Sequence, residues 1–137
     1  MLRILLFLLA MILATAVSAA ANEPLQLPAA GDIRVLIDIS GSMKKNDPAN
    51  LRRPALKLIT QIIPDGSVAG VWTFGQYVNA LVPHRKVDDE WRKLAIGKAE
   101  EVNSVALFTN IGGVLEKSFD DFVPGKNYSN THFILLT

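Results

Sequence analysis

A short apolar run that leads into a series of oxygen-bearing side chains constrains this chain more than any other feature. Residues 33–37 read Ile-Arg-Val-Leu-Ile, with Gly31-Asp32 before them and Gly41 shortly after. An apolar run of this length, rich in β-branched residues and bounded by turn residues, is typical of a buried strand. The sequence therefore predicts a strand that passes directly into a tight loop.

Three polar side chains, Asp38, Ser40 and Ser42, occupy alternate positions just after this run. Gly41 allows the backbone to turn sharply between the serines, so the three side chains can face one point on the rim at the strand end. One carboxylate and two hydroxyls form a hard oxygen set, which suits a Mg²⁺ ion that keeps water and accepts a further carboxylate from a partner. A plain turn, in which the same side chains cap backbone groups, is the alternative interpretation.

Strand-like and helix-like segments alternate along the rest of the chain. The expected strands cover residues 68–74, residues 77–82 up to Pro83, and residues 131–137. Because only Gly75-Gln76 separates the first two, they are expected to form a hairpin. The expected helices run from Asp47-Pro48 to Pro64 and over residues 88–102, with Asp88 as cap. Residues 114–122 complete a third helix, which ends before Pro124-Gly125.

The first of these helices is expected to pack one apolar face on the core. Pro54 would remove a hydrogen bond if it lay deep in the helix, so Asn50 is the expected effective cap. Apolar side chains recur after it at helical spacing. The predicted buried face consists of Leu51, Ala55, Leu58, Ile59, Ile62 and Ile63.

This order of elements predicts an α/β fold with a mainly parallel sheet. In doubly wound sheets of this kind, ligands bind beyond the carboxyl ends of the strands, at the point where the strand order reverses. The loop after Asp38 is a candidate for such a point.

The residues of this loop also resemble a known family. Asp38, Ser40 and Ser42, placed after an apolar strand, resemble the motif that opens the metal-ion-dependent adhesion site of von Willebrand factor type A domains. Thr109-Asn110-Ile111-Gly112 resembles the threonine loop of the same family, whose hydroxyl adds to the metal site. The family's glycine before that threonine is absent, and Leu107-Phe108 stands there instead. Judged from its residue type and position alone, Thr109 is also a credible helix cap.

The resemblance covers residues 32–137 and implies a doubly wound, Rossmann-like fold with helices on both faces of the sheet. It implies a Mg²⁺ ion, or Mn²⁺ or Ca²⁺ in its place, held by Asp38, Ser40, Ser42 and Thr109. It also implies that the strand before Asp38 and the strand that ends at Thr137 are neighbours. The family's complete sheet has further elements, so the chain is expected to be the amino-terminal part of an incomplete domain.

The amino terminus carries the pattern of a secretory signal peptide. Arg3 precedes an almost wholly apolar stretch at residues 4–17, and small residues follow at 18–21. We therefore expect a signal peptide over residues 1–21, a linker over 22–31 and a periplasmic or extracellular product. An uncleaved membrane anchor is the alternative. The chain has no cysteine, so it cannot form a disulfide.

Charge and histidine spacing argue against two further classes of partner. The chain has 14 basic and 13 acidic residues, a net charge of +1, which gives no basic excess for nucleic acid. His84 and His132 each lack a second histidine or a cysteine at ligand spacing, so no zinc site is expected.

Three functions remain open at this point. The first is an exported, metal-dependent protein-binding module whose ion accepts an acidic residue of a protein partner. The second is a Mg²⁺-dependent hydrolase or phosphatase that uses Asp38. Phosphoryl-transfer enzymes of the haloacid-dehalogenase-like kind need a second aspartate two residues on, and Ser40 stands there. The third is a degenerate, metal-free interaction domain. Membrane contact is expected only through an uncleaved signal anchor or a segment downstream of Thr137.

Overall fold

The structure is a computed structural model, and it describes residues 31–137. The predicted signal peptide lies outside the described residues, as does the predicted linker apart from Gly31. Strands and helices follow in the order β1 (Asp32–Asp38), α2 (Met43–Asn46), α3 (Arg52–Ile62), β2 (Val68–Phe74), β3 (Val78–Lys86), α4 (Asp89–Lys98), the 3₁₀ turn η2 (Ala99–Glu101), α5 (Ile111–Ser118) and β4 (Thr131–Leu136).

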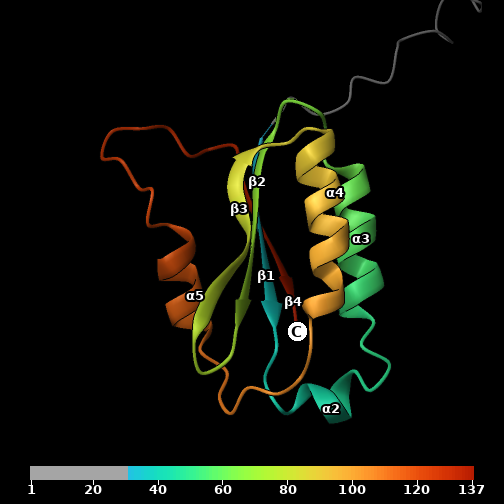
Figure 1. The fold of residues 1–137 in the computed structure, drawn as a ribbon. Helices are drawn as coiled ribbons and strands as arrows, with labels where there is room; N and C mark the ends of the chain where they lie inside the picture. Colours follow the sequence, from blue (N-terminus) through green and yellow to red (C-terminus); the bar gives the residue numbers. More distant parts are fainter. Residues whose placement is uncertain (1–30) are drawn as a thin grey trace, which may run out of the picture.

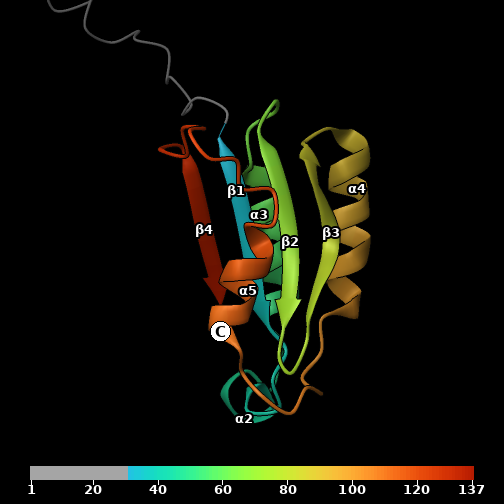
Figure 2. The same cartoon turned by 90° about the vertical axis from the view of Figure 1, so that its left-hand side faces the viewer.

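The strands form one mixed sheet in the order β3-β2-β1-β4 (Figure 2). β1 pairs in parallel with β2 on one edge and with β4 on the other, whereas β3 joins β2 as an antiparallel hairpin. The predicted α/β class, the predicted hairpin and the predicted pairing of the first and last strands are confirmed. The strand order therefore reverses at β1, the position that favours a ligand site.

Each face of the central strand contributes to a different core. Ile33, Val35 and Ile37 of β1 belong to the larger core, beneath α3 and α4. Leu36 belongs to a smaller core with Val114 of α5 on the opposite face. Figure 1 shows α3 and α4 on one side of the sheet and α5 on the other. Successive side chains of a strand point to opposite faces, which is why β1 contributes to both cores. The prediction that helices cover both faces of the sheet is confirmed.

β3 is longer than predicted, because it continues through Pro83 to Lys86. A proline cannot donate to the ladder, but it is tolerated on an edge strand and at a bulge. β3 is an edge strand, and its pairing with β2 shifts between Ala69 and Val71, where Pro83 and His84 oppose the single residue Gly70. The irregular register therefore falls at the proline, where a ladder donor is missing.

The predicted buried face of α3 was partly wrong. Leu51, Leu58 and Ile62 are exposed, whereas Arg52, Leu56 and Thr60 are buried. The helix is rotated because the Arg52 side chain reaches inward to polar groups at the end of β1. The predicted cap was also wrong, since Asn50 has a positive φ of 51° and donates to the Val102 carbonyl.

Capping accounts for the bounds of the helices. Asp47 accepts from the backbone N–H groups of Leu51 and Arg52 at 2.7 and 3.2 Å, and so satisfies the first turn of α3. Asp88 caps α4 as predicted, by accepting from the Trp91 N–H at 2.7 Å. α5 ends earlier than predicted, at Ser118, and its cap is Asn110 rather than Thr109.

Two leucines of α3 provide a direct test of this packing. We expect Leu56→Ala to lower the free energy of unfolding by about 2–5 kcal/mol, because it removes buried methylenes and leaves a cavity. Leu58→Ala changes the same residue type in the same helix at an exposed position, and should change the free energy by less than about 0.5 kcal/mol. Urea denaturation followed by circular dichroism measures both. Equal losses would contradict the observed orientation of α3.

Candidate functional site

The carboxyl end of β1 brings together three of the four residues singled out in the sequence. Asp38 is the last residue of β1, and the loop of Ser40 and Ser42 leads from it into α2. In Figure 1 this loop, α2 and the carboxyl end of β4 lie at the same end of the sheet. Asp38 and Ser40 are buried and Ser42 is exposed, so the expectation that all three lie on an exposed rim holds for Ser42 only.

Hydrogen bonds from two directions fix the Asp38 carboxylate. The Ser40 backbone N–H donates to Oδ1 at 2.7 Å, and the Thr137 hydroxyl of the neighbouring strand donates to Oδ2 at 2.8 Å. A carboxylate has about four lone-pair positions, so each oxygen retains acceptor capacity. The carboxylate is therefore oriented and still able to bind a further group. Thr137 was not predicted to have this role, although its place at the end of the paired strand brings it to the site.

The two serine hydroxyls of the loop after Asp38 are hydrogen-bonded to each other. Ser40 Oγ and Ser42 Oγ lie 2.9 Å apart. Neighbouring ligands in an octahedral Mg²⁺ site with bonds of 2.0–2.1 Å are also about 2.9 Å apart. Residues 31–137 contain no cluster of three or more His, Cys, Asp or Glu side chains that could hold a metal. Any cation bound in this loop would therefore be held through one carboxylate and hydroxyls, and not through several carboxylates.

Thr109 is placed differently from the other three candidates. It is exposed in the loop before α5, and within the described residues no hydrogen bond joins it to Asp38, Ser40 or Ser42. Its loop is nevertheless attached to the site, because Ala106 accepts from the Gly41 N–H at 2.6 Å and donates to the Ile39 carbonyl at 3.0 Å. The structure thus brings the threonine loop to the serine loop without bringing the Thr109 hydroxyl into the hydrogen-bonded cluster.

A buried arginine, Arg52, connects the segments around the site. Its guanidinium donates to the Asp38 carbonyl, to the Asp47 carboxylate at 2.8 Å and to Ser104 Oγ at 2.7 Å. The end of β1, the start of α3 and the loop leading toward Thr109 are therefore held by one side chain. No pattern in the sequence indicates this role, since an arginine in the first turn of an amphipathic helix is usually solvated.

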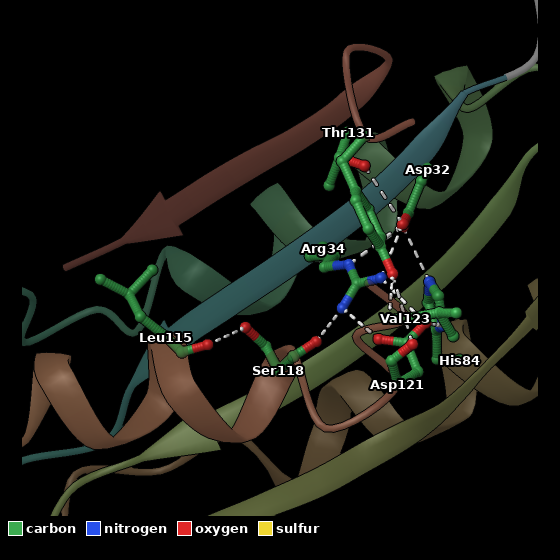
Figure 3. A network of polar contacts seen from close by, with 9 residues as sticks. Asp32, Arg34, His84, Leu115, Ser118, Asp121, Val123 and Thr131 are labelled. Carbon is green, nitrogen blue, oxygen red and sulfur yellow. Dashed lines mark hydrogen bonds and ion pairs between the residues drawn. The ribbon is translucent and has the colours of Figure 1, made fainter. Parts of the chain in front are cut away.

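A second polar cluster lies at the opposite end of β1 (Figure 3). The Arg34 guanidinium is fully buried and pairs with Asp32 at 2.7 Å and with Asp121 at 2.7 Å, and it also donates to the Ser118 carbonyl. His84 Nε2 lies 2.8 Å from Asp32 Oδ1. The cluster ties the segment after α5 to the sheet. Because Arg34 stands within the apolar run, its burial requires this full set of partners.

These interactions change the acidity of both carboxyl groups. Burial raises the pKa of Asp32, but hydrogen bonds from Arg34 and His84 outweigh it and hold the pKa below its usual range. The hydrogen bond from the Arg34 guanidinium is the main cause of the lowered pKa of Asp121. Both side chains are therefore carboxylates at neutral pH, as a buried guanidinium requires.

Comparison with known proteins gives the fold a context. No protein-family model and no curated protein matches the chain. A solved structure described as von Willebrand factor type A from Catenulispora acidiphila matches with a TM-score of 0.59 at 19% identity over 64% of this chain. Proximal thread matrix protein 1 from the mussel byssus matches in two crystal forms, with TM-scores of 0.59 and 0.61 at 25% and 24% identity, each over 79% of this chain.

These likenesses show that the described part of the chain has a von Willebrand factor type A-like fold, as the sequence motifs had suggested. The match covers 22% of the Catenulispora chain and 29% of the byssus protein. The chain thus spans less than a third of the length of the structures it resembles.

The cluster around Arg34 predicts a dependence of stability on pH. The pKa values of Asp32 and Asp121 are lower in the folded chain than in the unfolded chain, so their contribution is present above the usual aspartate range and is lost as the pH falls. Asp121→Asn should therefore flatten the fall in the free energy of unfolding between about pH 5 and pH 2. Urea denaturation at a series of pH values measures it.

The matched control is Asp120→Asn, which removes the neighbouring carboxylate from an exposed pair with Lys117. Exposed pairs of this kind contribute little to stability. An Asp121→Asn chain whose pH dependence equals that of the control and of the wild type would contradict the role of the cluster.

Proposed function

We propose that this chain is a metal-dependent protein-binding module. Asp38, Ser40 and Ser42 would hold a divalent cation, Mg²⁺ or in its place Mn²⁺ or Ca²⁺, at the carboxyl end of β1. Thr109 would add its hydroxyl from the adjoining loop. Such an ion has few protein charges around it and stays electrophilic, so it favours an anionic ligand such as an acidic side chain of a protein partner.

The observation that carries this proposal is the convergence of three hard oxygen groups at one strand end. The carboxylate of Asp38 is oriented by two hydrogen bonds, and the Ser40 and Ser42 oxygens lie 2.9 Å apart beside it. The two serine hydroxyls bond each other and not the backbone groups of the turn, and their separation also suits two neighbouring ligands of one Mg²⁺ ion. The position of β1 at the reversal of strand order supports the same conclusion.

The likeness to solved structures supports a binding role over a catalytic one. The von Willebrand factor type A fold commonly mediates protein interactions, and one of the similar structures is named as a thread matrix protein. The carboxylate of the partner would complete the coordination of the ion.

A Mg²⁺-dependent hydrolase would need a general base near Asp38. Both histidines lie at the other end of the sheet, where His84 contacts Asp32 and His132 contacts Asn130 next to the start of β4. The carboxylate of Asp47 is already paired with Arg52 at 2.8 Å. The placement of these groups favours binding over hydrolysis. Binding measured with and without a metal chelator distinguishes a metal-free interaction domain from the metal-dependent module.

The proposed place of action is outside the cytoplasm, in the periplasm or beyond the cell. The support is the signal-peptide pattern before residue 22. Within residues 31–137 no helix is long and apolar enough to cross a bilayer.

The proposal is tested by the binding of Mg²⁺ alone, followed by titration calorimetry. We expect Asp38→Asn, which keeps the size of the side chain but removes its charge, to weaken Mg²⁺ binding by about tenfold or more, because affinity rises with ligand charge. Ser42→Ala should also weaken it, and it removes an exposed hydroxyl that the fold does not need. Circular dichroism verifies that each variant is folded.

Matched controls are Asp89→Asn and Ser129→Ala, which change exposed residues outside the site. They should bind Mg²⁺ as the wild type does. Unchanged Mg²⁺ affinity in folded Asp38→Asn would refute the assignment. Protein binding that persists in a metal chelator would favour the metal-free interaction domain.

A further inference from the structure

The most exposed apolar side chains of the described chain are gathered in two loops. Of the five most exposed large hydrophobic residues within 31–137, four lie in the β2–β3 hairpin or in the loop before α5. We call these four the apolar rim: Tyr77, Val105, Leu107 and Phe108. Leu107 and Phe108 are 77% and 64% exposed, and they stand where the sequence departs from the related threonine loop.

Both loops adjoin the candidate metal site. Ala106, in the middle of the rim, hydrogen-bonds Gly41 and Ile39 of the serine loop. Gly75 of the hairpin lies so close that a side chain there would come within 2.1 Å of the Ala106 Cβ and 3.2 Å of the Phe108 carbonyl. Figures 1 and 2 show the hairpin tip and the segment before α5 at the end of the sheet where α2 lies. The rim is therefore continuous with the site.

The loop that carries most of the rim is held in place by buried and half-buried polar contacts. Arg52 donates to Ser104 Oγ at 2.7 Å and to the Asn103 carbonyl at 3.2 Å. Arg53 and Asn50 both donate to the Val102 carbonyl at 2.8 Å. Binding such a pre-arranged surface costs a partner little ordering entropy. Isolated exposed apolar residues need no explanation, but a gathered set beside a polar site marks an interaction surface.

The charged side chains near the rim indicate the sign of the charge expected on the partner. Lys44 and Lys45 of α2 are exposed, directly after Ser42. Of the acidic groups in the same region, Asp47 is paired with Arg52, and Asp38 is the buried carboxylate assigned to the ion. The free charge on this surface is therefore positive, which complements an acidic ligand.

We propose that the apolar rim selects partners whose metal-binding acidic residue is flanked by a large apolar side chain. The inference rests on the proposed function, because the acidic residue is placed by the ion. The flanking leucine or phenylalanine packs on Leu107 and Phe108, and a partner with only small or polar neighbours loses that contact. The specificity of the site is thus set by residues that bind no metal.

The test uses the full chain and two synthetic peptides in excess Mg²⁺. In the first, a central aspartate is flanked by leucine and phenylalanine, and in the second by serine on both sides. NMR titration gives the affinity of each peptide and locates the perturbed signals. We expect the apolar-flanked peptide to bind about tenfold more tightly, because part of its side-chain surface leaves water. The signals of the rim should shift together with those of Gly41 and Ser42.

The double variant Leu107→Ser, Phe108→Ser should abolish the preference between the peptides while leaving the Mg²⁺ affinity unchanged. The matched control is Leu58→Ser, Ile62→Ser on α3, where the two side chains are 60% and 68% exposed. This control should keep the full preference. Because all four side chains are exposed, both double variants are expected to fold.

The outcomes separate this inference from the proposed function. If the peptide preference depends on Leu107 and Phe108 but is the same in a chelator, the metal assignment fails, and with it the part of the inference in which the ion places the acidic residue. If Mg²⁺ promotes binding of both peptides equally, or if neither peptide binds, the rim inference is overturned. Sedimentation velocity provides a second check. If the Leu107→Ser, Phe108→Ser chain keeps the peptide preference but no longer self-associates, the inference is overturned, because the rim would then join two copies of the chain.

Discussion

The structure depends on one central strand that is covered on both faces and paired on both edges. β1 lies between β2 and β4, and its apolar side chains enter two different cores. A strand in this position cannot shift its register by one residue, because every side chain would move to the opposite face. Packing along the whole of β1 therefore fixes the position of Asp38 at the carboxyl end of the strand. The candidate site is held in place by the same packing.

Polar groups at the two ends of β1 serve different purposes. At the amino end, Asp32 and Asp121 compensate the charge of the buried Arg34, and this cluster fastens the segment after α5. At the carboxyl end, Arg52 binds backbone and side-chain groups around Asp38 but leaves the carboxylate itself to Ser40 and Thr137. In the Arg34 cluster the charged groups are paired with one another, whereas the Asp38 carboxylate retains acceptor positions for a ligand.

The sequence predicted the fold class and the loop that follows β1 because both depend on local pattern. Each of the patterns used spans only a few residues: the apolar run of β1, the short Gly75-Gln76 connection of the hairpin, and the alternation of Asp38, Ser40 and Ser42. The orientation of α3 was not predictable in the same way, since it is decided by Arg52, whose partners lie far along the chain at Asn103 and Ser104. The extension of β3 through Pro83 likewise depends on its edge position, which the sequence does not contain.

Paramagnetic broadening by Mn²⁺, followed in the amide NMR spectrum, is the measurement that tests the central claim most directly. Mn²⁺ takes the oxygen ligands that suit Mg²⁺. The account predicts that the amide signals of Ser40, Gly41 and Ser42 broaden first. The amide of Arg34 should stay sharp at the same Mn²⁺ level, because four residues of extended strand place it about 13 Å from Asp38. Broadening centred on Asp32 and Asp121, or spread over the exposed carboxylates, would contradict the account.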